Sequence, residues 1–362
     1  MGMGDADCMR ARPRVFALFQ KRIDGDDALL HLARARFREA RLGAEFYANT
    51  QEELAWLIGF SPFPDMSSMA HLSRSISLFD RDSRNAVIEC ARRFGEKVYG
   101  IVVHDEASIA TRLDEYVEIL GQLQSRLMHI PNSPLLFIEY AVGLDPETFL
   151  SLFRAAESLS RVSCCIDIGH LGLRLARRHY AEMHPGDDVC SIRPDDAGLH
   201  GLLGDIETSL RSAVQASASI ISGLCSLGKP THFHLHDAHP LSTSSPFGVS
   251  DHLSFLEDIP LSLSHYGSRS LRPMYGPSGL SRIVEASLTL PPESLSFSLE
   301  IHPSEVREAL GPWSHLFDHW VDRKNAERMN HWLSVLIKNY TVLQEILGSM
   351  RPTPLTRKRS AS

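Results

Sequence analysis

The stretch Ser163-Cys-Cys-Ile-Asp-Ile-Gly-His170 is a short apolar segment that delivers an aspartate and, three residues later, a histidine. Its side chains favour a buried strand that ends at Asp167. Burying an aspartate without a partner costs several kcal/mol, and the stretch itself contains no lysine or arginine. A metal ion is one partner that would offset this cost. The stretch therefore predicts a strand whose carboxyl end carries chemistry.

The rest of the chain repeats this pattern, because seven further strand-like segments alternate with helical ones. The eight predicted strands span residues 15–19, 43–48, 68–72, 99–104, 135–139, 163–167, 231–237 and 296–300. Consecutive parallel strands need a crossover connection, usually a helix. Eight such strands are the number that closes a barrel. We therefore expect an α/β fold, a single (β/α)₈ TIM barrel.

Helical periodicity and compositional breaks divide the chain further. The predicted helices span residues 26–41, 50–57, 80–94, 107–128 and 278–289, and another begins behind Asp145. The predicted organisation is a disordered N-terminus at 1–13, the barrel at 14–315, a C-terminal helix at 316–349 and a basic disordered tail at 350–362. Residues 171–229 form a helical insertion after the sixth strand. The C-terminal helix either covers the barrel bottom or pairs with another subunit in a homo-oligomer.

Composition excludes several classes of partner. The 362 residues carry a formal net charge of -7, which argues against a nucleic-acid partner. No run reaches the length of a membrane span, and residues 1–14 lack the apolar core of a signal peptide. The six cysteines form no C-x-x-C pair, which favours a reduced, cytoplasmic protein. No glycine-rich phosphate-binding motif is present, so no nucleotide cofactor is indicated.

Acidic and histidine side chains gather where the predicted strands end, the end of a (β/α)₈ barrel that holds active sites. Glu139 and Glu300 end strongly apolar strands, where an unpaired carboxylate is hard to explain. Carboxylate and imidazole ligands without thiolate suit Zn²⁺, Mn²⁺, Fe²⁺ or Co²⁺. The candidate ligands, from the third strand to the eighth, are His71, His104, Glu139, Asp167, His170, His234, His236, Asp237, Asp251, His252 and Glu300.

Some of these residues also have an ordinary structural explanation. His71 or His104 alone fits a hydrogen-bonded histidine at a strand end. His170 fits the cap of the helix that follows, and Asp251 fits a helix cap of its own. The case for a metal centre therefore rests on the whole set rather than on any single member.

The elements Phe-Ile-Glu139, Cys-Ile-Asp167-Ile-Gly-His170, His234-Leu-His-Asp237 and Ser-Leu-Glu300 resemble the xylose isomerase-like TIM-barrel superfamily, over roughly residues 15–310. That superfamily contains sugar isomerases and epimerases as well as endonuclease IV-type AP endonucleases. The resemblance implies a core metal site made of Glu139, Asp167, His234 and Glu300.

The two branches differ in what surrounds this core. In the isomerase branch the resemblance implies one metal ion, with two glutamates moving protons next to a carbonyl. The endonuclease branch adds histidines, which His71, His104, His170 and His252 match. It also places an aspartate two residues before the last of these, where this sequence has Ser250 and puts Asp251 next to the histidine instead.

The leading prediction is a divalent-metal-dependent isomerase or epimerase of a small sugar or sugar phosphate. Its catalytic residues would be Glu139, Glu300 and His170. The first alternative is a multinuclear metal-dependent phosphoester hydrolase of the endonuclease IV type, in which Glu139 bridges two ions. The second alternative is a barrel without activity that serves as a binding protein.

Overall fold

The computed structural model describes most of the chain, with a few gaps. The described residues are 12–19, 26–141, 143–192, 196, 198–242, 252–263, 267–301 and 326–350, with the backbone alone at 242, 259–263, 267–270, 327 and 328. Several predictions therefore lie outside the described residues: nearly all of the disordered N-terminus, the basic tail, the start of the C-terminal helix, and Asp251.

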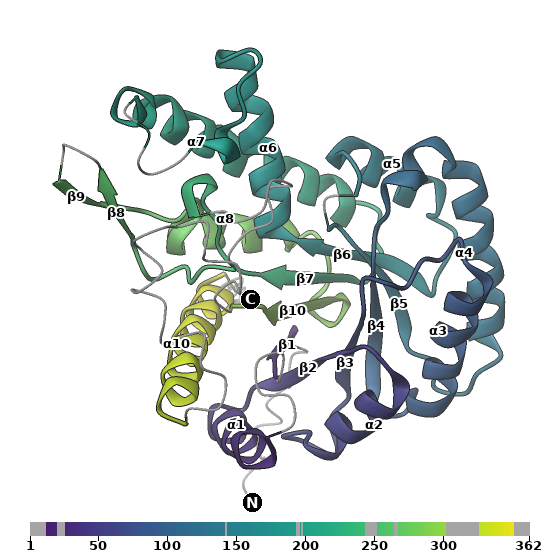
Figure 1. The fold of residues 1–362 in the computed structure, drawn as a ribbon. Coiled ribbons are helices and arrows are strands. Elements are labelled where there is room, and N and C mark those ends of the chain that lie inside the picture. Colours follow the sequence, from purple (N-terminus) through teal and green to yellow (C-terminus); the bar gives the residue numbers. More distant parts are fainter. Residues whose placement is uncertain are drawn as a thin grey trace, which may run out of the picture.

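Eight parallel strands close into a barrel, as Figure 1 shows, which confirms the predicted fold class. Going round the barrel from β1, the neighbours follow chain order to β7, and β10 then pairs with both β7 and β1. The strands are β1 (Arg14–Leu18), β2 (Gly43–Ala48), β3 (Ser68–Leu72), β4 (Val98–His104), β5 (Leu135–Glu139), β6 (Val162–Asp167), β7 (Thr231–Leu235) and β10 (Leu295–Leu299).

Helices surround the barrel on its outside (Figure 1). They are α1 (Asp27–Ala40), α2 (Gln51–Gly59), α3 (Arg81–Phe94), α4 (Leu113–Met128), α5 (Pro146–Ala155), α6 (Ile168–Met183), α7 (Leu199–Cys225), α8 (Gly276–Ser287) and α10 (Ala326–Ser349). The helix predicted at 107–128 is in fact two elements, the 3₁₀ turn η1 (Ala107–Thr111) and α4. They separate at Arg112, whose φ of -133° is not helical and whose guanidinium binds Glu115.

Local sequence decides where several helices begin. The side chains of Asp26, Thr50 and Asp80 each accept a hydrogen bond from a backbone N–H in the first turn of α1, α2 and α3. Asp167 does the same for α6, accepting from His170 N at 2.8 Å. Asp145 occupies the predicted cap position of α5, but its carboxylate binds Arg174 instead of the helix backbone.

Two segments add to the barrel. The insertion at 171–229 consists largely of α6 and α7, which pack against each other and extend beyond the barrel in Figure 1. The antiparallel hairpin of β8 (Ile259–Leu263) and β9 (Gly267–Leu271) projects beside them and was not predicted. Among the described helices, none combines the length and apolarity needed to cross a membrane.

The barrel interior changes from apolar to polar along its axis. Phe16, Met69, Val102, Phe137 and Cys165 form a small buried cluster inside the barrel, separate from the large core between the strands and the helices. Towards the carboxyl ends of the strands, the inward positions carry carboxylates and imidazoles instead. The apolar cluster thus forms the floor of a polar mouth.

Candidate metal centre

Strand register brings the predicted residues to one level at the mouth. His104 at the end of β4 lies beside Glu139 of β5, and Asp167 of β6 lies beside His234 of β7. Glu300 follows β10 directly, and its backbone N–H donates to Leu235 O of β7. Parallel pairing in a closed barrel therefore gathers side chains that are far apart in sequence.

Glu139, Asp167, His234 and Glu300 form the central group. Their ligand atoms all lie within 4.8 Å of one another, and all four residues are buried. His234 Nδ1 lies 3.2 Å from Glu139 Oε1 and 3.3 Å from Glu300 Oε2. This is the set that the superfamily resemblance implied, and the structure places its members together in an arrangement that could hold a metal ion.

His71, His104 and Glu139 form one of the two groups that flank the central group, and it is called the first group. His71 Nε2 lies 3.3 Å from His104 Nε2 and 3.0 Å from Glu139 Oε2, and His104 Nε2 lies 3.4 Å from that same oxygen. Ligand atoms bound at about 2.0 Å around a tetrahedral zinc ion lie about 3.3 Å apart. The three side chains therefore have the spacing of a three-ligand site with one open position.

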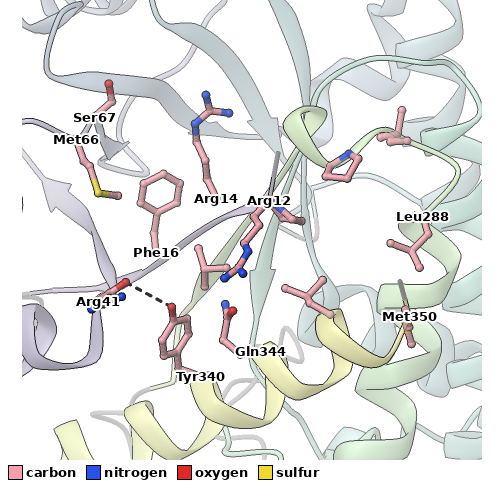
Figure 2. A pocket seen from close by; sticks show the side chains of 15 residues that line it. Arg12, Arg14, Phe16, Arg41, Met66, Ser67, Leu288, Tyr340, Gln344 and Met350 are labelled. Atoms are coloured by element: carbon pink, nitrogen blue, oxygen red, sulfur yellow. Dashed lines mark hydrogen bonds between the residues drawn. The ribbon is translucent and has the colours of Figure 1, made fainter. Parts of the chain in front are cut away.

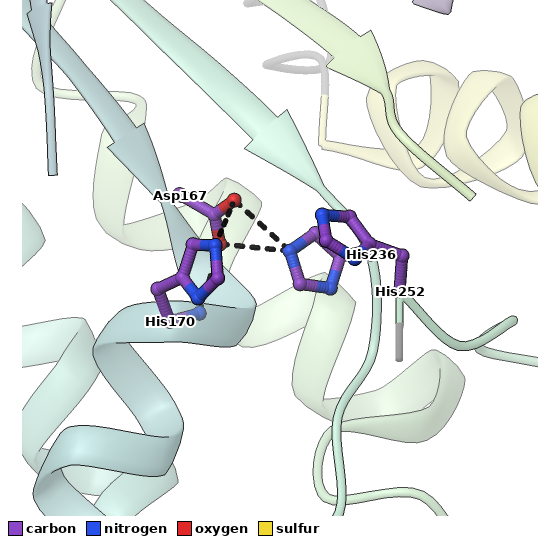
Figure 3. A group of neighbouring side chains, drawn as sticks. All are labelled: Asp167, His170, His236 and His252. Atoms are coloured by element: carbon purple, nitrogen blue, oxygen red, sulfur yellow. Dashed lines mark hydrogen bonds and ion pairs between the residues drawn. The ribbon is translucent and has the colours of Figure 1, made fainter. Parts of the chain in front are cut away.

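Asp167, His170, His236 and His252 form a third group, drawn in Figure 3. His236 Nε2 lies 2.8 Å from Asp167 Oδ1, and His170 Nε2 lies 3.5 Å from Asp167 Oδ2. The rings of His236 and His252 stack with their centroids 4.1 Å apart. The cap of α6 is the Asp167 carboxylate, which accepts from His170 N. The His170 side chain does not cap the helix and points into this group instead.

Orphaned polar atoms support the fit of cations to these groups. Among the described residues, Glu139 Oε2 and one ring nitrogen, Nδ1, of each of His71, His104 and His170 are buried without a hydrogen-bond partner of good geometry. Buried polar atoms are nearly always paired, so each such atom calls for an explanation. Divalent metal ions at these groups would satisfy the carboxylate oxygen directly.

The electrostatics of the mouth also fit ligands rather than a simple salt bridge. Burial favours the neutral form of Glu139, but the imidazoles of His104, His234 and His71 outweigh it and hold its pKa well below the usual range. Burial opposes charge on His71 as well, yet Glu139 and Glu45 raise its pKa to about 9. Burial lowers the pKa of His104 to about 3, so its neutral ring is ready to bind a cation at neutral pH.

A backbone contact between two loops places His252 at the mouth. Asp237 N donates to Leu253 O at 2.7 Å, and Leu253 N donates back to Asp237 O at 2.9 Å. His252 itself has a φ of 53°, in the left-handed region that few residues other than glycine adopt. Asp237 belongs to none of the three groups, because its carboxylate accepts backbone N–H bonds from Ala238, Tyr275 and Gly276. Its role is therefore to hold the loops together.

Sequence reasoning missed two buried residues below the mouth, Glu45 and His232. Glu45 lies in the middle of β2, and its carboxylate contacts His232 Nε2 at 3.3 Å and His234 Nε2 at 3.0 Å. A signal was present, because His232 alternates with His234 along β7 and so shares its inward face. Neither residue stands at the carboxyl end of its strand, where the sequence pattern predicted the ligands.

A further cavity lies at the other end of the barrel. It has a volume of about 820 Å³ and is lined by Arg14, Phe16, Leu290 and Tyr340, among others (Figure 2). Several of these residues stand where strands begin, and none of them belongs to the three groups. This cavity is therefore separate from the mouth.

The fold and its mouth define a (β/α)₈ barrel with buried groups able to hold metal. No protein-family model matches the sequence, and no curated protein matches it. The chain is similar to the solved carboxyl transferase domain of Rhizobium etli pyruvate carboxylase with oxamate and biotin, at 11% identity and a TM-score of 0.35. That match covers 94% of this chain and 48% of the other, so the chain spans about half its length.

A chitinase from Chromobacterium violaceum is similar at 8% identity and a TM-score of 0.38, covering 82% of this chain and 98% of the chitinase. Likenesses this weak carry no argument about function.

Proposed function

We propose that this protein is a multinuclear, divalent-metal-dependent phosphoester hydrolase, allied to the endonuclease IV-type branch of the xylose isomerase-like superfamily. One observation carries the proposal: the three groups form a continuous row, because Glu139 belongs to the first two and Asp167 to the last two. A one-metal isomerase needs only the central group. The flanking histidines, including His71 and His252, have no role in that design.

Glu139 is placed to serve two ions at once. Its Oε1 faces His234 Nδ1 of the central group, and its Oε2 faces the ring nitrogens of His71 and His104. When bound, the ions would supply Lewis acidity towards a phosphate oxygen and lower the pKa of a coordinated water. The carboxylates of the row would hold the ions, and the buried walls would exclude bulk water from the reacting groups.

An arginine at the mouth supports an anionic substrate. Arg74 follows β3 with an exposed side chain, and its Nε lies 3.3 Å from His104 Nε2. Its guanidinium is therefore beside the first group, where a phosphate oxygen would approach, and guanidinium pairs well with phosphate. The net charge of -7 argues against long nucleic acid, so we propose a small phosphoester as substrate.

The sugar isomerase or epimerase remains the second candidate, favoured by one feature of the central group. Glu139 and Glu300 both contact His234 Nδ1, at 3.2 Å and 3.3 Å. Two glutamates around one ion would suit proton transfer on either side of a small sugar. Under this alternative, Glu139, Glu300 and His170 keep the catalytic roles that the sequence suggested.

Metal stoichiometry tests the proposal. The metal-free chain is reconstituted with zinc or manganese, excess metal is removed, and metal content is measured together with hydrolysis of a generic phosphodiester and phosphomonoester. Two or three ions per chain with hydrolysis are expected, whereas a single ion without hydrolysis would favour the isomerase. Glu139→Gln should lose more than one ion because it bridges two groups. Glu118→Gln, on the exposed face of α4, is the matched control.

A further inference from the structure

We propose that Glu45 is a positioning residue, which fixes the ring orientation and tautomer of His71 and of His234 and so couples the first and the central metal groups. The inference rests on the metal centre of the proposed function and adds a residue to it. Glu45 lies on β2, beneath the row of candidate ligands, and is 2% exposed.

One oxygen of Glu45 serves both histidines. Oε1 lies 3.0 Å from His234 Nε2 and 3.3 Å from His71 Nδ1. The other oxygen, Oε2, accepts from Ser298 Oγ and lies 3.3 Å from His232 Nε2. Both oxygens of this buried carboxylate are therefore engaged by side chains inside the barrel.

The carboxylate determines which ring nitrogens remain for a metal. An ionised carboxylate only accepts hydrogen bonds, so His234 must present an N–H to it, and the 3.3 Å ion pair favours a proton on the His71 nitrogen that faces it. His71 then carries its proton on Nδ1, and His234 carries its proton on Nε2. The nitrogens that a cation would take, by displacing a proton, are then His71 Nε2 and His234 Nδ1, which are the two atoms that face Glu139.

The two histidines thus have opposite tautomers, imposed by one atom. His71 belongs to the first group and His234 to the central group. A carboxylate that orients a metal-binding histidine from behind typically contributes one to two orders of magnitude to metal affinity. Because Glu45 acts on one ligand of each group, its loss should weaken both ions together.

Substitution of Glu45 tests this coupling. Glu45→Gln removes the negative charge, and its neutral amide oxygen is a weaker acceptor for the two ring N–H groups than the carboxylate, so both imidazoles are held less firmly. Zinc titration in competition with a chromophoric chelator should show two ions bound about 10- to 100-fold more weakly. The affinity of an ion at the third group should not change. Comparison with His252→Ala, which removes a ligand of that group alone, identifies which of the measured affinities belongs to it.

Ser298→Ala is the matched control. It removes a hydrogen bond to the same carboxylate, but on Oε2, and leaves the contacts to both histidines in place. We expect its zinc affinities to stay within about twofold of the unaltered chain. Equal weakening in Ser298→Ala and Glu45→Gln would indicate a merely structural role for Glu45 and overturn the inference.

A second measurement uses the chain with Glu45 intact, so its result does not depend on whether Glu45→Gln folds. In the zinc-loaded unaltered chain with ¹⁵N-labelled histidine, chemical shifts distinguish binding through Nδ1 from binding through Nε2. His71 should bind zinc through Nε2 and His234 through Nδ1, with assignments from His71→Gln and His234→Gln. Binding of either ring through the nitrogen that faces Glu45 would overturn the inference.

The outcomes separate this inference from the proposed function. If the unaltered chain takes up fewer than two zinc ions, the multinuclear hydrolase is wrong, whatever Glu45 does. If it takes up two or more and Glu45→Gln binds them equally well, the positioning role alone is wrong.

Discussion

Asn339 of α10 accepts a hydrogen bond at Oδ1 from the backbone N–H of Phe255, 3.1 Å away. Its Nδ2 donates to Ser254 Oγ at 2.9 Å, and the side chain is fully buried. Residues 254 and 255 lie two and three positions after His252 of the third group. The final helix therefore does more than complete the wall between α1 and α8: it holds the loop that presents a candidate ligand.

Removal of this contact should weaken both the fold and the third group. Asn339→Ala leaves the buried N–H of Phe255 without its partner, which should lower the free energy of unfolding by about 1–3 kcal/mol. The loop that carries His252 should loosen, so zinc affinity at the third group should fall while the central group is spared. Urea unfolding and zinc titration measure the two effects. Asn330→Ala on the same helix removes only an exposed hydrogen bond from Arg36, so it should leave zinc affinity unchanged and alter stability by less than about 0.5 kcal/mol, and an equal effect of both variants would contradict this role.

Gly169 leaves room for the ring of His236. A Cβ atom added there would lie 2.0 Å from His236 Cε1, so Gly169→Ala must displace the ring from Asp167. We expect a loss of about 1–3 kcal/mol of stability and at least about tenfold weaker zinc binding at the third group.

Gly201→Ala is the control for this substitution, because no atom lies within 4 Å of a Cβ added there in α7. It should leave metal binding unchanged and raise stability by about 0.5–1 kcal/mol. Unaltered zinc affinity in Gly169→Ala would show that His236 is not a ligand.

Metal binding should release protons at neutral pH. The raised pKa of His71, about 9, means that the metal-free ring carries a proton below that pH, and a cation must displace it. Apparent affinity at the first group should therefore rise by up to about tenfold per pH unit and level off above about pH 9. His104, with a pKa of about 3, contributes no proton in this range. Calorimetry in two buffers of different ionisation enthalpy should give at least one proton released, and none released at pH 7 would contradict the His71 assignment.

Lys229 stabilises the fold away from the mouth. Its Nζ donates to the carbonyls of Ala156, Glu157 and Leu159, at 3.1, 3.1 and 2.5 Å, where α5 ends. Lys229→Met keeps most of the packing volume but leaves these carbonyls without the ammonium, so the free energy of unfolding should fall by about 2–4 kcal/mol. Lys97→Met, at an exposed site, should change it by less than about 0.5 kcal/mol. A loss in metal content of Lys229→Met under native conditions would mean that its effect is not confined to stability.

The strands, and so the barrel, could be predicted because their signals are local. Apolar β-forming runs such as Leu135–Glu139 and Val162–Asp167 can be recognised from their own residues alone. The break at Arg112 was missed because Ile109 and Leu113 keep helical spacing across it, and the β8–β9 hairpin was missed as well. The positions of Glu139, Asp167, His234 and Glu300 at strand ends were also predictable, since parallel strands in a barrel end at one mouth.

The sequence by itself determined the barrel and the kind of side chain at the end of each strand. Only the tertiary structure decided that Glu139 and Asp167 are each shared between groups, that Glu45 lies behind two candidate ligands, and that His252 returns to the mouth. The physical reason is separation along the chain: Glu45 lies 189 residues from His234, and Asn339 lies 84 residues from Phe255. Such contacts exist only once closure of the barrel has fixed the register of all its strands.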